Sequence, residues 1–144
     1  MPHTFYQIWI HLAWATKNRA SVLIEGKRDM IFEHMKELAL AKGYYLDRIN
    51  GVEDHVHCLI SLQPKHALSK VVKDLKGESS RWINEMQVLA DSFEWQEGYG
   101  AFSVSNQNVP IVREYIRNQV RHHRKFSYEE EMDQMKLLSQ TPSP

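Results

Sequence analysis

Two histidines stand two residues apart in the segment EDHVHCLI, residues 53–60. In a β-strand alternate side chains point to the same face, so His55 and His57 would lie side by side, together with Leu59 and Ser61. Two imidazoles at this spacing can bind one cation, and metal sites of several unrelated kinds use it. The pair alone is a weak signal, because histidines at this spacing more often belong to an exposed polar strand face.

A second pair of chemically useful residues occurs in VREYIRNQVRHH, residues 112–123. Tyr115 and Gln119 are four residues apart, which places both on one face of a helix. The amide carbonyl of Gln119 is a hard oxygen donor that could complete a metal site begun by two histidines, and the phenolate of Tyr115 is a competent nucleophile. The alternative is a structural role, in which Tyr115 joins the aliphatic residues of a packing stripe and Gln119 lies at its polar edge.

Charge is unevenly distributed near the end of the sequence, although the formal net charge is zero. Between residues 113 and 125 five basic residues accompany a single acid, Glu114, whereas residues 129–133 carry four acids. The basic residues are Arg113, Arg117, Arg121, Arg124 and Lys125. Such a basic helix suits contact with phosphates, and it is equally typical of a solvated helix face.

The composition predicts a soluble globular protein. With 144 residues, 42% hydrophobic and 25% charged, the chain is long enough to bury a core as one domain. We expect a cytoplasmic protein, because there is no membrane-length apolar run and no signal-peptide pattern. The single cysteine, Cys58, suits a reducing compartment and is better explained as a small core residue than as a nucleophile.

Periodicity predicts the order β-α-β-β-α-β-α. The expected strands are residues 5–15, residues 44–52, the histidine strand, which ends before Pro64, and residues 99–105. The first helix is expected at 28–42, ended by Gly43, and the second starts at the N-cap Ser69 and runs to about Met86. The third is capped by Asn108, has Pro110 in its first turn and continues to about Lys125. Glu53 and Asp54 form the tight connection into the histidine strand.

This order predicts an α+β fold, the ferredoxin-like split βαβ sandwich. Its four-stranded antiparallel sheet carries two helices on one face, which would cover the side chains of Val56, Cys58, Ile60 and Leu62. The face with His55 and His57 is then left open to the third, tyrosine-bearing helix. Residues 126–144 form an acidic tail that we expect to be partly helical or loose.

Two further residues near the histidines have simpler explanations. Asp54 could orient the adjacent imidazole, but a turn residue is the simpler interpretation. His11 lies among aromatic residues of the first strand and is better explained as a hydrogen-bonded sheet-face residue than as a fourth metal ligand.

The motifs together resemble a known family. HVH matches the His-hydrophobic-His signature of the HUH endonucleases, and its combination with YIRNQ resembles the single-tyrosine HUH transposases of the insertion-sequence-200-like group. The resemblance covers about residues 3–125 in order and leaves the tail, residues 126–144, outside the catalytic domain of residues 1–125. Its further segments are HLAWATKNR, DHVHCLI, LKGESSRWIN and WQEGYGAFSVS.

The resemblance implies a specific chemistry. His55, His57 and Gln119 would bind Mg²⁺ or Mn²⁺, and Tyr115 would attack a phosphodiester of single-stranded DNA. The products would be a 5′-phosphotyrosine link and a free 3′-OH, so that the enzyme cleaves and rejoins strands at hairpin-containing element ends. It would act as a homodimer, without a membrane partner. Candidate DNA contacts are Lys70, Lys73, Lys76, Arg81, Arg117 and Arg121.

Two alternatives from other functional classes remain. The first is a domesticated relative that binds DNA hairpins, and regulates or processes repeats without transposition. The second is a metal-binding ferredoxin-like protein unrelated to DNA, which leaves the basic helix unexplained. The intact set of His55, His57, Tyr115 and Gln119 favours the enzyme.

Overall fold

The computed structural model describes residues 3–139, except the side chains of residues 122 and 137–139. A four-stranded sheet lies at its centre, with neighbouring strands antiparallel in the order β2-β3-β1-β4. The strands are β1 (Ile8–Ala15), β2 (Tyr45–Gly51), β3 (His55–Leu62) and β4 (Gly100–Val104). This strand order confirms the predicted split βαβ arrangement.

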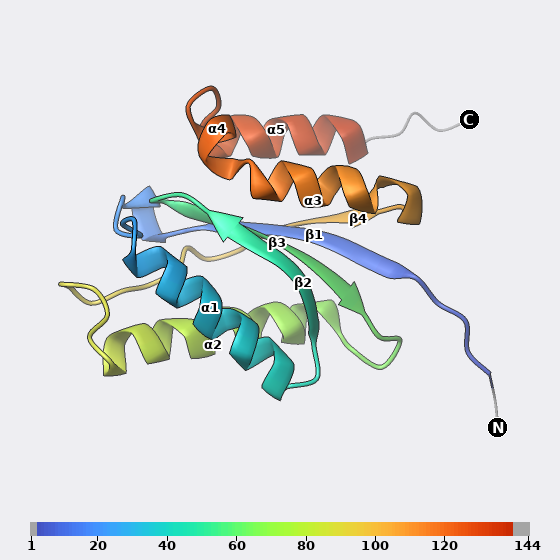
Figure 1. Cartoon of the computed structure of the whole chain (residues 1–144), viewed down its shortest axis with the longest axis horizontal. Helices are drawn as coiled ribbons and strands as arrows, with labels where there is room; N and C mark the ends of the chain where they lie inside the picture. Colours follow the sequence, from blue (N-terminus) through green and yellow to red (C-terminus); the bar gives the residue numbers. More distant parts are fainter. Residues whose placement is uncertain (1–2, 140–144) are drawn as a thin grey trace.

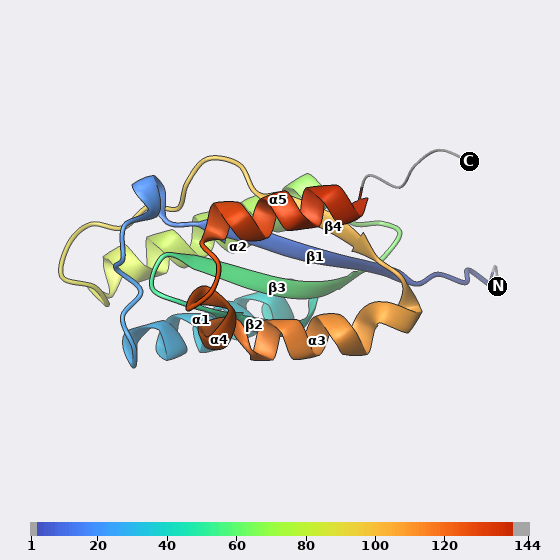
Figure 2. The same ribbon diagram turned by 90° about the horizontal axis from the view of Figure 1, so that it is seen from above.

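Helices cover both faces of the sheet (Figure 1). On one face lie α1 (Lys27–Ala41) and α2 (Leu68–Glu85). On the other lie α3 (Val109–Arg117), α4 (Gln119–His123) and α5 (Tyr128–Ser139). Short 3₁₀ turns, η1 (Lys17–Arg19) and η2 (Asn106–Asn108), follow β1 and β4. Viewed from above, α3 and α5 run beside each other, with β1 and β3 visible between them (Figure 2).

As predicted, one face of β3 packs in the main core and the other carries the histidines. Val56, Cys58 and Ile60 are fully buried in the main core, which lies between the sheet and the helices α1 and α2. The opposite face of the sheet carries two smaller clusters, one built around Leu59 under α3 and one built around Ala13 under α5. Strand alternation therefore places the histidines beneath α3, α4 and α5, outside the main core.

Two details of the helix ends differ from the predictions. Helix α2 begins at Leu68 with Ala67 as its N-cap, so Ser69 lies inside the first turn and is not the cap. Asn108 does precede α3, but its side chain makes no capping hydrogen bond. Gly43 does end α1 as predicted, with a φ of 76° that a residue without a Cβ adopts at no steric cost.

The predicted third helix is interrupted. It stops at Arg117, and Asn118 has a φ of −96° and a ψ of 25° before α4 starts at Gln119. Tyr115 and Gln119 therefore belong to two short helices that meet at Asn118. Part of the predicted acidic tail is helical and forms α5.

None of the helices within residues 3–139 combines the length and the apolar composition that crossing a bilayer requires.

Candidate active site

Side chains from four elements meet on the face of the sheet that α1 and α2 leave uncovered. All of them are fully or nearly buried except the tyrosine, which is half-buried. They are His55 and His57 from β3, Tyr115 from α3, Gln119 from α4 and Glu131 from α5. The structure thus brings together the four residues that the sequence singled out, and it adds a carboxylate.

The first strand leaves room for this cluster. Ala13 pairs with His57 and Ala15 pairs with His55, so small side chains lie opposite both imidazoles. His11, two residues before Ala13 on the same face, places its Nε2 2.9 Å from Nδ1 of His57. Burial and the neighbouring imidazole of His57 lower the pKa of His11 to about 3, so its ring is neutral at pH 7.

Each histidine of β3 is oriented by a contact at Nδ1, the ring nitrogen that faces away from the cluster. His55 donates from Nδ1 to Oδ1 of Asp54 at 2.7 Å, and Nδ1 of His57 faces His11. This hydrogen bond gives Asp54 an orienting role in addition to its place in the turn. Both Nε2 atoms consequently point at one spot, where each lies 3.1 Å from an oxygen of Glu131.

Charge at the site is concentrated between His55 and Glu131. Burial favours the neutral imidazole, but the hydrogen bonds to Asp54 and Glu131 outweigh it and raise the pKa of His55 to about 9. Burial likewise opposes the charge on Glu131, yet the hydrogen bonds from His55 and His57 hold the pKa of this carboxyl well below its usual range. His55 and Glu131 therefore form a buried ion pair, with Glu131 only 1% exposed.

Tyr115 is part of the same network. Its hydroxyl donates a hydrogen bond to Oε2 of Glu131, and its ring packs edge-on against the rings of His11 and His57. Burial, the Glu131 hydrogen bond and the Glu131 charge together raise the pKa of the Tyr115 phenol well above its usual value. Tyr115 is therefore a neutral phenol until a positive charge compensates for the carboxylate.

Gln119 contributes an oxygen that has no partner among the described residues. Its Nε2 donates to Oε2 of Glu131 at 3.5 Å, while its buried Oε1 has no hydrogen-bond partner there. An unpaired buried carbonyl oxygen is costly unless something binds it. A divalent cation fits this spot, since two imidazole nitrogens, an amide oxygen and a carboxylate are ligands that Mn²⁺ and Mg²⁺ accept.

Asn50 on β2 is a positioning residue that the sequence analysis missed. Its Nδ2 donates to the carbonyl oxygens of Ile116 and Arg117 at 3.0 and 3.2 Å, and the residue pairs with His57 on the neighbouring strand. These bonds satisfy the last turn of α3 and accompany the break at Asn118. An asparagine inside a strand is unfavourable, which was the available signal.

The predicted DNA contacts fall on two sides of the molecule. Lys70, Lys73, Lys76 and Arg81 lie on α2, across the sheet from Tyr115, and Lys76 donates to the carbonyls of Gln96 and Gly98 at 2.8 Å.

The two predicted contacts beyond α2 are closer to the site in the fold. Arg117 and Arg121 lie on the Tyr115 side, on α3 and α4, and Arg117 is paired with Glu114. Arg113, the other basic residue of α3, makes a bidentate ion pair with Asp47 of β2 at 2.8 and 3.0 Å and so anchors the helix to the sheet.

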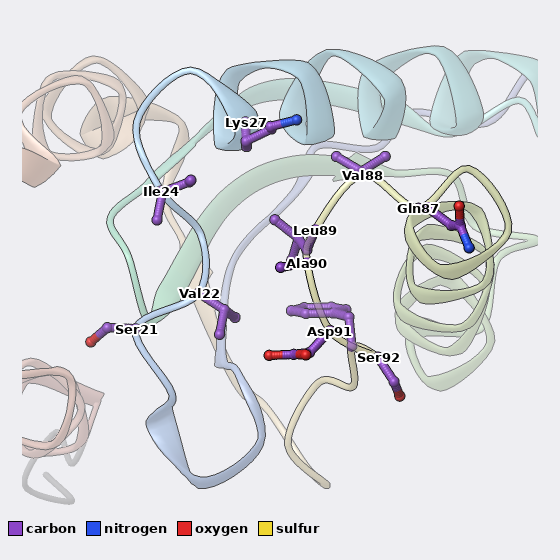
Figure 3. Close-up of a pocket in the computed structure, with 11 residues that line it drawn as sticks. Ser21, Val22, Ile24, Lys27, Gln87, Val88, Leu89, Ala90, Asp91 and Ser92 are labelled. Atoms are coloured by element: carbon purple, nitrogen blue, oxygen red, sulfur yellow. The ribbon is translucent and has the colours of Figure 1, made fainter.

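Tyr115 lines an open hollow of about 560 Å³ beside α3. The hollow is also lined by Pro110, Ile111, Glu114 and Asn118. A separate hollow of about 500 Å³ lies between the segment before α1 and the loop after α2 (Figure 3). It includes none of the cluster residues, and it is lined by residues 87–93 together with Ser21, Val22, Ile24 and Lys27.

Comparison with known proteins identifies the family. Residues 4–119 match the family model described as "Transposase IS200 like". The chain is 29% identical over 119 residues to the ISDra2 transposase TnpA of Deinococcus radiodurans, covering 79% of this chain and 85% of that protein. It is 26% identical over 125 residues to the transposase for insertion sequence element IS200 of Salmonella typhimurium, covering 83% and 82%.

Two solved structures are similar as well. A crystal structure described as a transposase of Deinococcus radiodurans R1 has a TM-score of 0.67 and 29% identity, over 83% of this chain and 95% of that one. A REP-associated tyrosine transposase bound to a REP hairpin has a TM-score of 0.60 over 82% and 71%, and at 14% identity it shows a shared fold. The chain belongs to the IS200-like transposase family.

Proposed function

We propose that this transposase cleaves and rejoins single-stranded DNA, with Tyr115 as nucleophile and with Mg²⁺ or Mn²⁺ held by His55, His57 and Gln119. One observation carries the proposal. A single carboxylate, that of Glu131, is in contact with both histidine Nε2 atoms, the Tyr115 hydroxyl and the Gln119 amide. Nucleophile and ligands thus surround one point in the same chain.

The chemistry follows from what these residues can do. The phenol oxygen of Tyr115 loses its proton and bonds to phosphorus, while the bond from phosphorus to the 3′ oxygen breaks and that oxygen takes up a proton. A divalent metal, when bound, polarises the phosphate and stabilises its developing charge. Because the phosphotyrosine link retains the energy of the broken ester, a 3′-OH can attack it and reverse the step.

The positions of the ligands are set before any substrate arrives. Asp54 and His11 face the Nδ1 atoms of His55 and His57, so both Nε2 atoms are directed into the cluster. Asn50 holds the end of α3. Such preorganisation lowers the entropy cost of aligning the phenol with a phosphate.

The substrate we propose is a single strand next to a hairpin end. Two findings support this choice: membership of the family, and the REP hairpin that is bound to the structurally similar REP-associated tyrosine transposase. The open hollow that Tyr115 lines leaves room for an unpaired strand beside α3. We expect no reaction with duplex DNA of the same sequence.

We also propose a homodimer in which each Tyr115 acts with the histidines of its own chain. Tyr115 lies against His57 and Glu131 of its own chain, a geometry that is compatible with cleavage in cis. Mixing Tyr115→Phe protein with His57→Ala protein should then give no cleavage beyond that of either variant. Restored cleavage in the mixture would show that the tyrosine acts on the partner's site.

The decisive experiment detects the covalent intermediate. Wild-type protein is incubated with end-derived single strands and Mg²⁺ or Mn²⁺, and adducts are separated on denaturing gels and mapped by peptide mass spectrometry. We expect the nucleotide on Tyr115, and none with Tyr115→Phe. The matched control is Tyr45→Phe, which alters an exposed tyrosine of β2 and should leave the adduct intact.

Two outcomes would contradict the proposal. An adduct on another tyrosine, or cleavage by Tyr115→Phe, would reject the nucleophile. Tight hairpin binding by a folded wild-type protein that forms no adduct with either metal would favour the hairpin-binding, non-transposing alternative.

A further inference from the structure

The carboxylate of Glu131 lies outside the residues that match the family, 4–119, and no sequence motif assigns it a role. It nevertheless lies at the centre of the cluster. We propose that Glu131 is the carboxylate ligand of the metal bound by His55 and His57, and that α5 is therefore part of the active site. This inference rests on the proposed function, because it concerns the same metal site.

Helix α5 is fixed in place by contacts that do not involve Glu131. Tyr128 and Met132, one turn apart on α5, are buried against Ala13 and Ala15 of β1. Gly100 of β4 makes room for this packing, since a Cβ there would lie 2.9 Å from the sulfur of Met132. The helix face directed at the sheet is thus determined by apolar packing.

The start of α5 is also well defined. The Ser127 hydroxyl accepts a hydrogen bond from the Glu130 N–H at 3.2 Å, and the Glu130 carboxylate accepts one from the Ser127 N–H at 3.1 Å. This reciprocal pair is a capping box. Because the first turn and the buried face of α5 are both fixed, the geometry of the helix places Glu131 beside the histidines.

The distances suit ligands of one ion. Each Nε2 of His55 and His57 lies 3.1 Å from a carboxylate oxygen of Glu131, and one ligand atom from each of the three residues lies within 4.8 Å of the others. Neighbouring ligands of an octahedral ion with bonds of about 2.1 Å are about 3 Å apart. The amide of Gln119 is also in contact with Glu131, at 3.5 Å through Nε2, and its buried Oε1, which has no partner among the described residues, is available as a fourth donor.

The carboxylate also supplies what the other donors lack. Neutral imidazoles and an amide carry no negative charge, whereas Mg²⁺ and Mn²⁺ are hard cations that favour anionic oxygen. A carboxylate that is 1% exposed is retained in a protein interior where it is paired with positive charge or coordinates a metal. A bound divalent cation would provide that charge.

The opposite interpretation is that Glu131 blocks the site, because it accepts the hydrogen bond of the nucleophilic phenol. Metal affinity separates the two interpretations. Removing a ligand weakens metal binding, whereas removing a residue that blocks the site does not. We would measure Mn²⁺ binding to full-length protein without DNA, by calorimetry and by electron paramagnetic resonance. The variants are Glu131→Gln, which keeps size and removes charge, and Asp133→Asn, an exposed control on the same helix.

We expect Glu131→Gln to weaken Mn²⁺ binding at least tenfold, to remove most of the thermal stabilisation that Mn²⁺ gives, and to require more Mn²⁺ for adduct formation. Asp133→Asn should match wild type. Melting curves in EDTA report whether Glu131→Gln is folded, and Glu131→Asp, which withdraws the carboxylate by one methylene, repeats the affinity test if it is not.

The outcomes distinguish this inference from the proposed function. Unchanged or tighter Mn²⁺ binding by Glu131→Gln, with equal or faster cleavage, would overturn the ligand assignment and show that Glu131 blocks the site. Unchanged binding by His55→Ala would overturn both, because the histidine site itself would be absent. Wild-type Mn²⁺ binding that depends on Glu131, without any Tyr115 adduct, would reject the nucleophile and support the ligand.

Discussion

Replacing Gly51 by alanine should destabilise the protein by displacing the strand that carries the histidines. Gly51 ends β2, and a Cβ on it would lie 2.3 Å from the carbonyl oxygen of His55 and 3.0 Å from both Cα of Val56 and a ring carbon of Phe32. The backbone of Gly51 is not in the left-handed region, so the effect is steric. Two of the three atoms belong to the main chain of β3, which cannot rotate away.

The structure sets the scale of this effect. Inserting a methyl group into a packed site costs about 1–3 kcal/mol, and a clash with main-chain atoms belongs to the upper half of that range. We expect a loss of about 2–3 kcal/mol, equivalent to a fall of roughly 7–10 °C in Tm for a chain of this size. The matched control is Gly77→Ala in α2, where nothing lies within 4 Å of the new Cβ and alanine should stabilise the helix by about 0.4–1 kcal/mol.

The stability of both variants is measured by urea and thermal unfolding, followed by circular dichroism. We expect glycine-to-alanine substitution to lower the stability at Gly51 and to raise it at Gly77. The Gly51 variant should also bind Mn²⁺ more weakly, because the His55 backbone must move. If the Gly51 and Gly77 variants shift stability in the same direction, or if the Gly51 variant melts within about 1 °C of wild type, the steric argument is wrong.

Three further changes test other parts of the fold. Arg113→Ala should lower the midpoint of urea unfolding, since it removes the bidentate partner of the Asp47 carboxylate, whose side chain is 3% exposed; adding Asp47→Asn should recover part of the loss, and strictly additive effects would contradict the coupling. Burial raises the pKa of the Cys58 thiol, so the folded state keeps a proton that the unfolded chain releases above about pH 8.5, and stability should fall with rising pH there; Cys58→Ala should lack this alkaline component, and a native thiol that reacts rapidly with a disulfide reagent would refute it. Lys76→Met should lower stability by about 1 kcal/mol while changing DNA affinity little in filter binding, because the ammonium donates to two loop carbonyls; a large loss of affinity without loss of stability would reverse that assignment.

The sequence was informative where local rules act. Alternation along residues 55–62 correctly placed His55 and Val56 on opposite faces, and Gly43 correctly ended α1, because strand geometry and a positive φ are local properties. The start of α2 was predicted wrongly for a related reason. Ser69 is a favourable cap by type, but the chain is already helical at Leu68.

The break at Asn118 could not be predicted in this way. VREYIRNQVRHH has a continuous helical pattern, and the residue that holds the end of α3, Asn50, comes from a strand far earlier in the sequence. A helix stop made by tertiary hydrogen bonds leaves no signal in its own segment. The spacing of Tyr115 and Gln119 still predicted that they meet, because the break lies at one residue between them and both remain beside Glu131.

The role of Glu131 also depends on tertiary contacts that its own segment does not reveal. The serine and glutamate of the capping box and the apolar spacing of Tyr128 and Met132 are visible in the sequence and predict a helix. The acidic composition of residues 126–144 predicted only a tail that is partly helical or loose, because composition does not reveal which acid faces inward. That depends on small residues in β1 and on Gly100 in β4, which together form the surface on which α5 lies.

The orientation of the two imidazoles links fold to function. Asp54 and His11 occupy the Nδ1 sides of His55 and His57, so the only remaining direction for both Nε2 atoms is toward α3, α4 and α5. A site built this way is complete only when the last helix docks, because Tyr115 and both histidines share their hydrogen bonds with one carboxylate of α5. Substitutions at Met132, which packs α5 against Ala13 and Ala15 of the sheet, should therefore weaken Mn²⁺ binding together with stability, whereas substitutions at the exposed Asp133 should affect neither.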